Sequence, residues 1–161
     1  MANELRIERL FDATPEEVYD AFVDPATQEM LHGSDRPDWV VQRCETDVRV
    51  GGTSVYAMGT KGVEPDVETR VFSVVERPSR LVFTHVMQID EWAGRTIETE
   101  MTITFEERDG KTLLTMVQTG FETAEDAAAF EEGWTAYLDT LRRVVAPDLP
   151  GDDTLKARHD T

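Results

Sequence analysis

Hydrophobic residues recur at two different spacings along this chain, at alternate positions up to residue 119 and at every third or fourth position after residue 123. Near the N-terminus, Leu5 and Ile7 alternate with charged neighbours, which predicts a half-buried strand within residues 4–11. Alternation of the same kind predicts six further strands, at residues 40–48, 53–59, 67–76, 80–89, 97–108 and 111–119. Turn residues separate these runs, and Asp109-Gly110 is a strong hairpin signal. The pattern therefore predicts an antiparallel meander.

Two short helices are predicted between the first strand and the rest of the sheet. Thr14-Pro15-Glu16-Glu17 has the form of a capping box with proline at the first helical position. Asp24-Pro25 repeats the combination of a capping side chain and a proline. The chain is therefore expected to enter the meander through helices that begin at Pro15 and Pro25.

The longest predicted helix follows the last strand. Thr123 and Asp126 form a start that resembles a capping box. The hydrophobic positions after it are Phe130, Trp134, Leu138, Leu141 and Val145. This spacing predicts a helix of about 22 residues, ~33 Å long, that ends before Pro147. Residues 147–161 are rich in Pro, Gly and Asp and are predicted to form a flexible tail, which leaves residues 1–146 as one domain.

The order of these elements restricts the fold. Hairpin-length connections between consecutive strands exclude a doubly wound parallel sheet. We expect an α+β fold in which a curved antiparallel sheet of about six or seven strands wraps around the long C-terminal helix. Such a sheet leaves a void wherever the helix does not fill its arc, and this void is the candidate binding site.

Composition and charge narrow the functional classes. The chain has 161 residues, as expected for a single domain, and no apolar run of the roughly 20 residues that a membrane span needs. The N-terminal residues lack the apolar core of a signal peptide, so a cytoplasmic protein is expected. A net charge of −17 argues against nucleic acid and anionic membranes as partners. The single cysteine, Cys44, excludes an intrachain disulfide and a multi-thiolate zinc site.

Five segments of the chain, taken together and in their order, say more about its relatives than any one of them does. They are residues 9–19, 47–52, 78–84, 112–116 and 133–141. Together they resemble the activator of heat-shock protein ATPase homologue-like (AHSA-type) family of the START superfamily, over about residues 4–146. The resemblance implies the helix-grip fold, a cavity between sheet and helix, and no cofactor. Leu31-His32 and Ser54 depart from the tryptophan and the large aromatic residue usual in the family, which implies a pocket of individual shape and polarity.

Strand parity and the helical repeat predict which side chains face the cavity. The predicted ligand-binding residues are Ser54, Tyr56, Met58, Phe83, His85, Met87, Met101, Met116, Gln118, Phe130, Trp134 and Tyr137. Four of them are methionines, which suit an adaptable apolar pocket, although methionine also serves as ordinary core filler.

Two interpretations of His85 are open. It is either a hydrogen-bonded core histidine or, together with Tyr56 and Gln118, the polar end of an apolar pocket with the capacity of a general base. His32 is expected near the cavity mouth, and His159 in the tail. The sequence contains no nucleophile elbow, dinucleotide fingerprint, P-loop or metal-binding histidine motif. Catalytic residues are therefore left unassigned, and no metal is expected.

Three functions are compatible with these features. The first is the binding of a small apolar or aromatic molecule in the cavity. The second, implied by the family resemblance, is a partner-binding module that activates a chaperone ATPase. The third is a cyclase- or hydratase-like enzyme in which His85 or Tyr56 moves protons. Binding is the leading hypothesis, because the sequence shows no catalytic motif.

Overall fold

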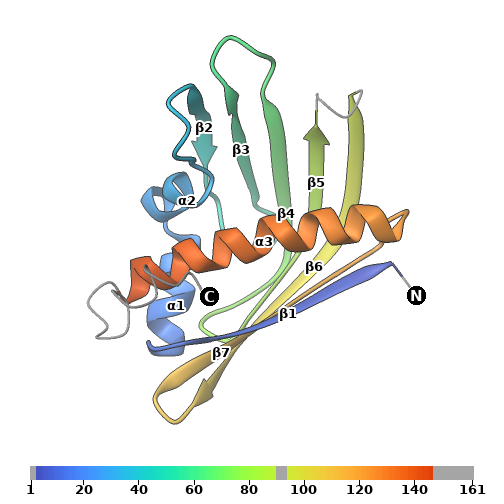
Figure 1. The fold of residues 1–161 in the computed structure, drawn as a ribbon. Coiled ribbons are helices and arrows are strands. Elements are labelled where there is room, and N and C mark those ends of the chain that lie inside the picture. Colours follow the sequence, from blue (N-terminus) through green and yellow to red (C-terminus); the bar gives the residue numbers. More distant parts are fainter. Residues whose placement is uncertain (1–2, 90–93, 147–161) are drawn as a thin grey trace.

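The computed structural model describes residues 3–89 and 94–146, and within them the chain forms one antiparallel sheet and three helices (Figure 1). The strands are β1 (Glu4–Phe11), β2 (Trp39–Glu45), β3 (Thr53–Thr60), β4 (Asp66–Glu76), β5 (Arg80–Ile89), β6 (Arg95–Arg108) and β7 (Lys111–Thr119). The helices are α1 (Pro15–Val23), α2 (Pro25–Leu31) and α3 (Ala124–Val145). This is the helix-grip α+β architecture predicted from the sequence.

The sheet brings the first strand of the chain beside the last. Its strands follow the order β1-β7-β6-β5-β4-β3-β2, so that Leu5 lies opposite Gln118 and Ile7 opposite Met116. β2 to β7 form the predicted meander, and Asp109-Gly110 makes the turn between β6 and β7 with a positive φ at both residues. α1 and α2 carry the chain from one edge of the sheet to the other.

The predicted caps begin the helices. The Glu17 N–H donates to Thr14 Oγ1 over 3.2 Å, and the Thr14 N–H donates to Glu17 Oε1 over 2.9 Å, which completes the capping box of α1. The Asp24 side chain accepts from the Thr27 N–H at the start of α2. At the start of α3, Thr123 Oγ1 accepts from the Asp126 N–H over 3.0 Å. These side chains satisfy backbone donors that have no partner within the helix.

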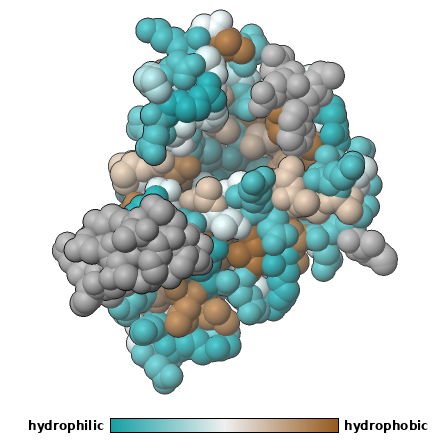
Figure 2. Space-filling model, in the orientation of Figure 1, coloured by the Kyte–Doolittle hydropathy of each residue, from teal (hydrophilic) through white to brown (hydrophobic). Residues whose placement is uncertain are grey.

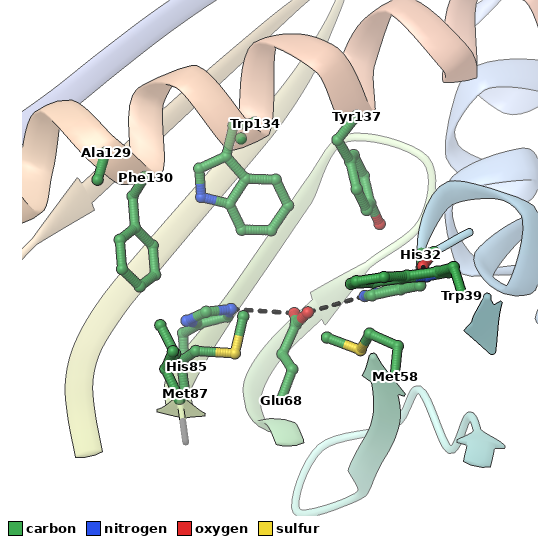
Figure 3. A pocket seen from close by; sticks show the side chains of 12 residues that line it. His32, Trp39, Met58, Glu68, His85, Met87, Ala129, Phe130, Trp134 and Tyr137 are labelled. Atoms are coloured by element: carbon green, nitrogen blue, oxygen red, sulfur yellow. Dashed lines mark hydrogen bonds and ion pairs between the residues drawn. The ribbon is translucent and has the colours of Figure 1, made fainter. Parts of the chain in front are cut away.

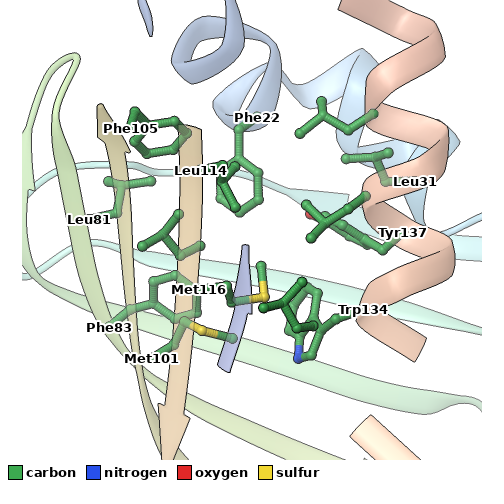
Figure 4. Close-up of a cluster of buried hydrophobic side chains, with 14 of the residues drawn as sticks. Phe22, Leu31, Leu81, Phe83, Met101, Phe105, Leu114, Met116, Trp134 and Tyr137 are labelled. Carbon is green, nitrogen blue, oxygen red and sulfur yellow. The ribbon is translucent and has the colours of Figure 1, made fainter. Parts of the chain in front are cut away.

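α3 crosses the concave face of the sheet, and its inward residues form much of the core (Figures 1 and 4). Leu138 and Leu141 are fully buried on the side of α3 that faces β1 and α1. An ion pair between Arg9 of β1 and Asp139 ties the helix to the sheet edge. The core on this side also holds Phe22, Phe105 and Leu114 (Figure 4).

One strand is shorter than predicted. The alternation at residues 40–48 suggested a strand through Val48, but β2 ends at Glu45. The chain then turns back so tightly that a Cβ atom at Gly52 would lie only 2.4 Å from the Asp47 carbonyl oxygen. Only glycine fits at this position. Asp47 and Arg49 form an exposed ion pair in this turn, with 3.0 Å between Arg49 Nε and Asp47 Oδ1. Turn geometry therefore overrides the alternating pattern here.

The predicted tail at residues 147–161, including His159, lies outside the described residues. Within the described part of the chain, no helix combines the length and the apolar character needed to cross a bilayer.

Candidate functional site

A cavity of about 350 Å³ lies between α3 and the strands β2 to β5. The residues that line it are His32, Trp39, Met58, Glu68, His85, Met87, Ile89, Ala129, Phe130, Gly133, Trp134 and Tyr137 (Figure 3). Ala129 and Gly133 are solvent-exposed lining residues, and Trp39 and Met87 are half-buried, so the cavity opens to solvent along this side of the helix. Figure 2 shows a recess in the surface above α3.

The helical repeat of α3 and the alternation of the strands determine which side chains form the cavity walls. On α3, Phe130, Trp134 and Tyr137 recur at intervals of four and three residues and point toward the sheet (Figure 3). On β5, His85, Met87 and Ile89 alternate and therefore share one face. Aromatic rings, thioethers and aliphatic groups make up most of the surface that a ligand would meet.

Glu68 supplies the polar centre of the cavity floor. Its carboxylate lies between two histidine rings, with His32 Nε2 2.8 Å from Oε1 and His85 Nε2 2.9 Å from Oε2 (Figure 3). Arg70 Nε donates to Oε2 over 2.6 Å. Glu68 is only 3% exposed and Arg70 1% exposed. A buried charge is stable only when it is paired and hydrogen-bonded, and this carboxylate meets both conditions.

Arg70 fills the space behind Glu68 and is surrounded by aromatic rings. Its guanidinium carbon lies 5.0 to 5.9 Å from five ring centroids, those of Phe22, Tyr56, Phe83, Trp134 and Tyr137. Its Nη2 group donates to the Tyr137 hydroxyl over 3.2 Å. Cation–π attraction and the ion pair together offset the loss of water around the guanidinium.

These contacts set the ionisation of the network. Burial works to raise the pKa of the Glu68 carboxyl, but the charge of Arg70 and the two histidines outweigh it and hold that pKa well below its usual range. Burial works to lower the pKa of Arg70, but Glu68 beside it raises that pKa. Burial also raises the pKa of Tyr137, so its hydroxyl stays protonated and donates to Gln28 Oε1 over 2.8 Å.

A chain of hydrogen bonds fixes the tautomer of His85. The Trp134 indole N–H can only donate, and it lies 2.8 Å from Gln118 Oε1. The amide nitrogen of Gln118 therefore faces Thr99 Oγ1 at 2.7 Å and His85 Nδ1 at 3.4 Å. Because Nδ1 accepts from an amide, the ring proton of His85 resides on Nε2, which donates to Glu68.

His32 is held differently from His85. Its Nδ1 lies 2.9 Å from the Gln28 carbonyl oxygen, and its Nε2 faces Glu68. Both partners are acceptors, so a ring that donates to both carries a proton on each nitrogen. The ring stacks on Tyr56 at 4.3 Å between centroids, and the His32 carbonyl oxygen accepts from Trp39 Nε1 over 3.0 Å.

The structure brings half of the predicted cavity residues to the cavity wall. Met58, His85, Met87, Phe130, Trp134 and Tyr137 line it. The other six, Ser54, Tyr56, Phe83, Met101, Met116 and Gln118, are buried in the core or in the hydrogen-bond network behind the wall. Gln118 does contact His85, as proposed for the polar end of the pocket, whereas Tyr56 bonds to Thr46 at 3.3 Å instead.

The residue that sequence reasoning missed most clearly is Glu68. It shares strand parity with Arg70 and Phe72, so all three side chains point inward from β4. Two charged residues at alternate positions beside a buried phenylalanine were the available signal for an internal ion pair. Trp39, Ile89, Ala129 and Gly133 also line the cavity, and His32, which was expected near the cavity mouth, lines it as a buried residue.

The two histidines and Glu68 do not form a metal centre. Their ring nitrogens converge on opposite oxygens of the carboxylate and not on a common point. Across residues 3–89 and 94–146, no group of three or more His, Cys, Asp or Glu side chains is arranged to hold a metal ion.

A curved antiparallel sheet that grips a long C-terminal helix, with a cavity between them, defines a START-like protein. Residues 12–146 match the family described as "Activator of Hsp90 ATPase homolog 1-like protein", and the chain belongs to this family. The family resemblance inferred from the five sequence segments is thereby confirmed.

Solved structures show the same fold. A crystal structure of a protein from Chromobacterium violaceum is 26% identical, with a TM-score of 0.77, and the match covers 92% of this chain and 100% of that one. An AHSA1-like protein from Aeromonas hydrophila, solved in solution, is 27% identical with a TM-score of 0.67, over 89% of this chain and 92% of that one. An AHSA1 protein from Silicibacter pomeroyi is 22% identical with a TM-score of 0.74, over 91% of this chain and 99% of that one, a likeness of fold. No curated protein matches the sequence significantly.

Proposed function

We propose that this protein binds a small, largely apolar or aromatic molecule in the cavity between α3 and strands β2 to β5. The observation that carries the proposal is the cavity itself. Its volume of about 350 Å³ falls within the range of roughly 300–1,000 Å³ that is typical of ligand sites. Its walls are mostly apolar, with a few convergent polar groups at one place, which is the usual composition of such sites.

The two alternative functions have weaker support. For a cyclase- or hydratase-like enzyme, His85 would have to accept a proton, but both of its ring nitrogens are engaged, with Glu68 and with Gln118. A chaperone-activating role rests on the family description alone. The cavity therefore favours ligand binding over both.

The binding proposal is tested by obstructing the cavity without disturbing the core. Ala129 lines the cavity and is exposed, whereas its neighbour Ala128 is exposed and lies outside the lining. Ala129→Leu and Ala128→Leu add the same side chain to the same helix, and leucine is a good helix former. We expect Ala129→Leu alone to weaken binding, because only this leucine enters the cavity.

The measurement is a native mass spectrometry and thermal-shift screen of the wild-type protein against lipids and aromatic compounds, followed by titration of each hit into both variants. Loss of binding in Ala129→Leu, with retention in Ala128→Leu, supports the proposal. Hits that bind both variants equally occupy another surface, and a screen without hits contradicts the proposal.

A further inference from the structure

The hydrogen-bonding capacity of the cavity wall restricts what the cavity can accept. Five lining side chains carry an N–H or O–H group: His32, Trp39, His85, Trp134 and Tyr137. The inference below rests on the proposed ligand-binding function and concerns the chemical class of the ligand.

Each of these donors already has a partner inside the protein. The two indole N–H groups donate to the His32 carbonyl oxygen and to Gln118 Oε1. The Tyr137 hydroxyl donates to Gln28. Both ring nitrogens of His32 face acceptors, the Gln28 carbonyl oxygen and Glu68, and the N–H group of His85 donates to Glu68. Among the described lining residues, therefore, no side-chain donor remains for a ligand.

An acceptor does remain, on Glu68. An ionised carboxylate offers about four acceptor positions, two on each oxygen. Oε2 receives hydrogen bonds from Arg70 and His85, whereas Oε1 receives one, from His32. The carboxylate is a lining group and stands at the centre of the cavity floor in Figure 3. Oε1 thus keeps one position for a donor supplied from the cavity.

The free acceptor on Glu68 favours a ligand that donates a hydrogen bond, and the charges near the cavity floor do not change this preference. Arg70 is a cation and Glu68 is the anion with which it pairs, but Arg70 is not among the lining residues. An anionic ligand would lose its water and find no free side-chain N–H group among the described lining residues, and a buried ion without hydrogen bonds is costly. A neutral ligand that donates one hydrogen bond loses less solvation and gains a bond to an ionised acceptor.

We propose that the cavity selects uncharged ligands that carry one hydrogen-bond donor, such as a hydroxyl or amide N–H, on an apolar or aromatic body, and that it discriminates against anions of the same shape. A phenol or an aromatic alcohol belongs to the favoured class. An aromatic carboxylate belongs to the disfavoured one.

Three ligands of nearly equal shape test this selectivity: 2-naphthol, which donates; 2-methoxynaphthalene, which can only accept; and 2-naphthoate, an anion at neutral pH. Dissociation constants are measured by calorimetric titration at pH 7 with the full chain. We expect 2-naphthol to bind at least about tenfold more tightly than either of the others, since a hydrogen bond to a charged acceptor has about this effect. Binding should be lost in Ala129→Leu, which locates it in the cavity.

The outcomes separate this inference from the function on which it rests. If 2-methoxynaphthalene or 2-naphthoate binds in the cavity as tightly as 2-naphthol, the selectivity is refuted and the binding function stands. If none of the three binds, both are refuted for ligands of this size.

A donor placed in the wall should reduce the discrimination against anions. Met87 is a half-buried wall residue, and its neighbour Gln88 is exposed and outside the lining. Met87→Lys supplies a free ammonium to the cavity, and we expect it to strengthen 2-naphthoate binding about tenfold. Gln88→Lys adds the same charge to the same strand outside the cavity and should leave the dissociation constant unchanged. An equal effect of both variants would mean that overall charge, and not the missing donor, excludes anions.

Discussion

The two sides of α3 meet the same sheet in different ways. Toward β1 and α1 the helix packs tightly, and Leu138 and Leu141 are fully buried. Toward β2 to β5 it leaves a cavity of about 350 Å³, and Ala129 and Gly133 remain exposed. The small side chains at these two positions, about one helical turn apart, leave the cavity open to solvent beside the helix.

A layer of charged residues separates the closed side from the open one. Arg70 is enclosed by aromatic rings, and Glu68 faces the cavity with a histidine at each oxygen. Because this layer is hydrogen-bonded and buried, the apolar core cannot simply collapse into the cavity. The cavity therefore has a floor built from hydrogen-bonded charged groups, and substitutions in the floor and on both sides of α3 test this interpretation.

The largest effect is expected from Glu68→Gln. The substitution leaves Arg70 and His32 buried beside a neutral amide, and breaking a buried ion pair in this way costs about 3–5 kcal/mol of unfolding free energy. Chemical denaturation measures the loss. Adding Arg70→Met to Glu68→Leu should restore part of it, because the guanidinium is then not left as an unpaired buried charge.

The pH dependence of that loss provides a control. The pKa of Glu68 is lower in the folded state than in the unfolded state, so its contribution is complete above the unfolded pKa of about 4.3 and declines as the pH falls toward the folded value. The difference in unfolding free energy between wild type and Glu68→Gln should therefore be largest near pH 7 and shrink below about pH 4. A difference that does not change over this range would mean that Glu68 is not stabilised as an anion.

A second pair of variants compares the two sides of the helix directly. Leu141→Ala opens a void in the closed side and should cost about 2–5 kcal/mol. Met87→Ala removes a half-buried side chain that already borders a cavity, and should cost less than about 1 kcal/mol. Thermal and urea unfolding of both proteins measures the contrast, and equal losses would show that the open side is packed as tightly as the closed one.

The smallest effect is a stabilisation. Gly133 lies within α3, and apart from its chain neighbours and the backbone of the helix itself no atom lies within 4 Å of the position that a Cβ would take there. Gly133→Ala should therefore raise the unfolding free energy by about 0.5–1 kcal/mol, through the higher helix propensity of alanine. A lower thermal midpoint for this variant would show that the space beside Gly133 is filled.

The fold could be predicted from local signals because those signals agree with one another. The caps at Thr14 and Thr123, the alternation of the strands and the Asp109-Gly110 turn each depend on neighbouring residues, and the structure has all of them. The predicted end of β2 was wrong, because the strand stops before a turn in which the backbone approaches itself closely at Gly52, and alternation does not reveal this turn.

The candidate site was less predictable for a physical reason. Strand parity shows which side chains point inward, but not how far α3 lies from each strand, and that distance decides whether Met101 is core or Met87 is wall. The ion pair of Glu68 and Arg70 has only a weak local signature, because the burial of both residues depends on coverage by α3 and α2. Charged residues at inward positions of β4 were the one sign of it in the sequence.

The pairing of β1 with β7 has a consequence for the order of folding. Leu5 and Ile7 are synthesised before every other strand of the sheet, yet the strand that pairs with theirs ends at Thr119, and the helix that packs against β1 follows later still. Contacts between residues so distant in the chain form slowly, because a long loop must close before they contribute. The first strand therefore completes the sheet late, and during translation its apolar side chains remain without their native partners until β7 and α3 have been made.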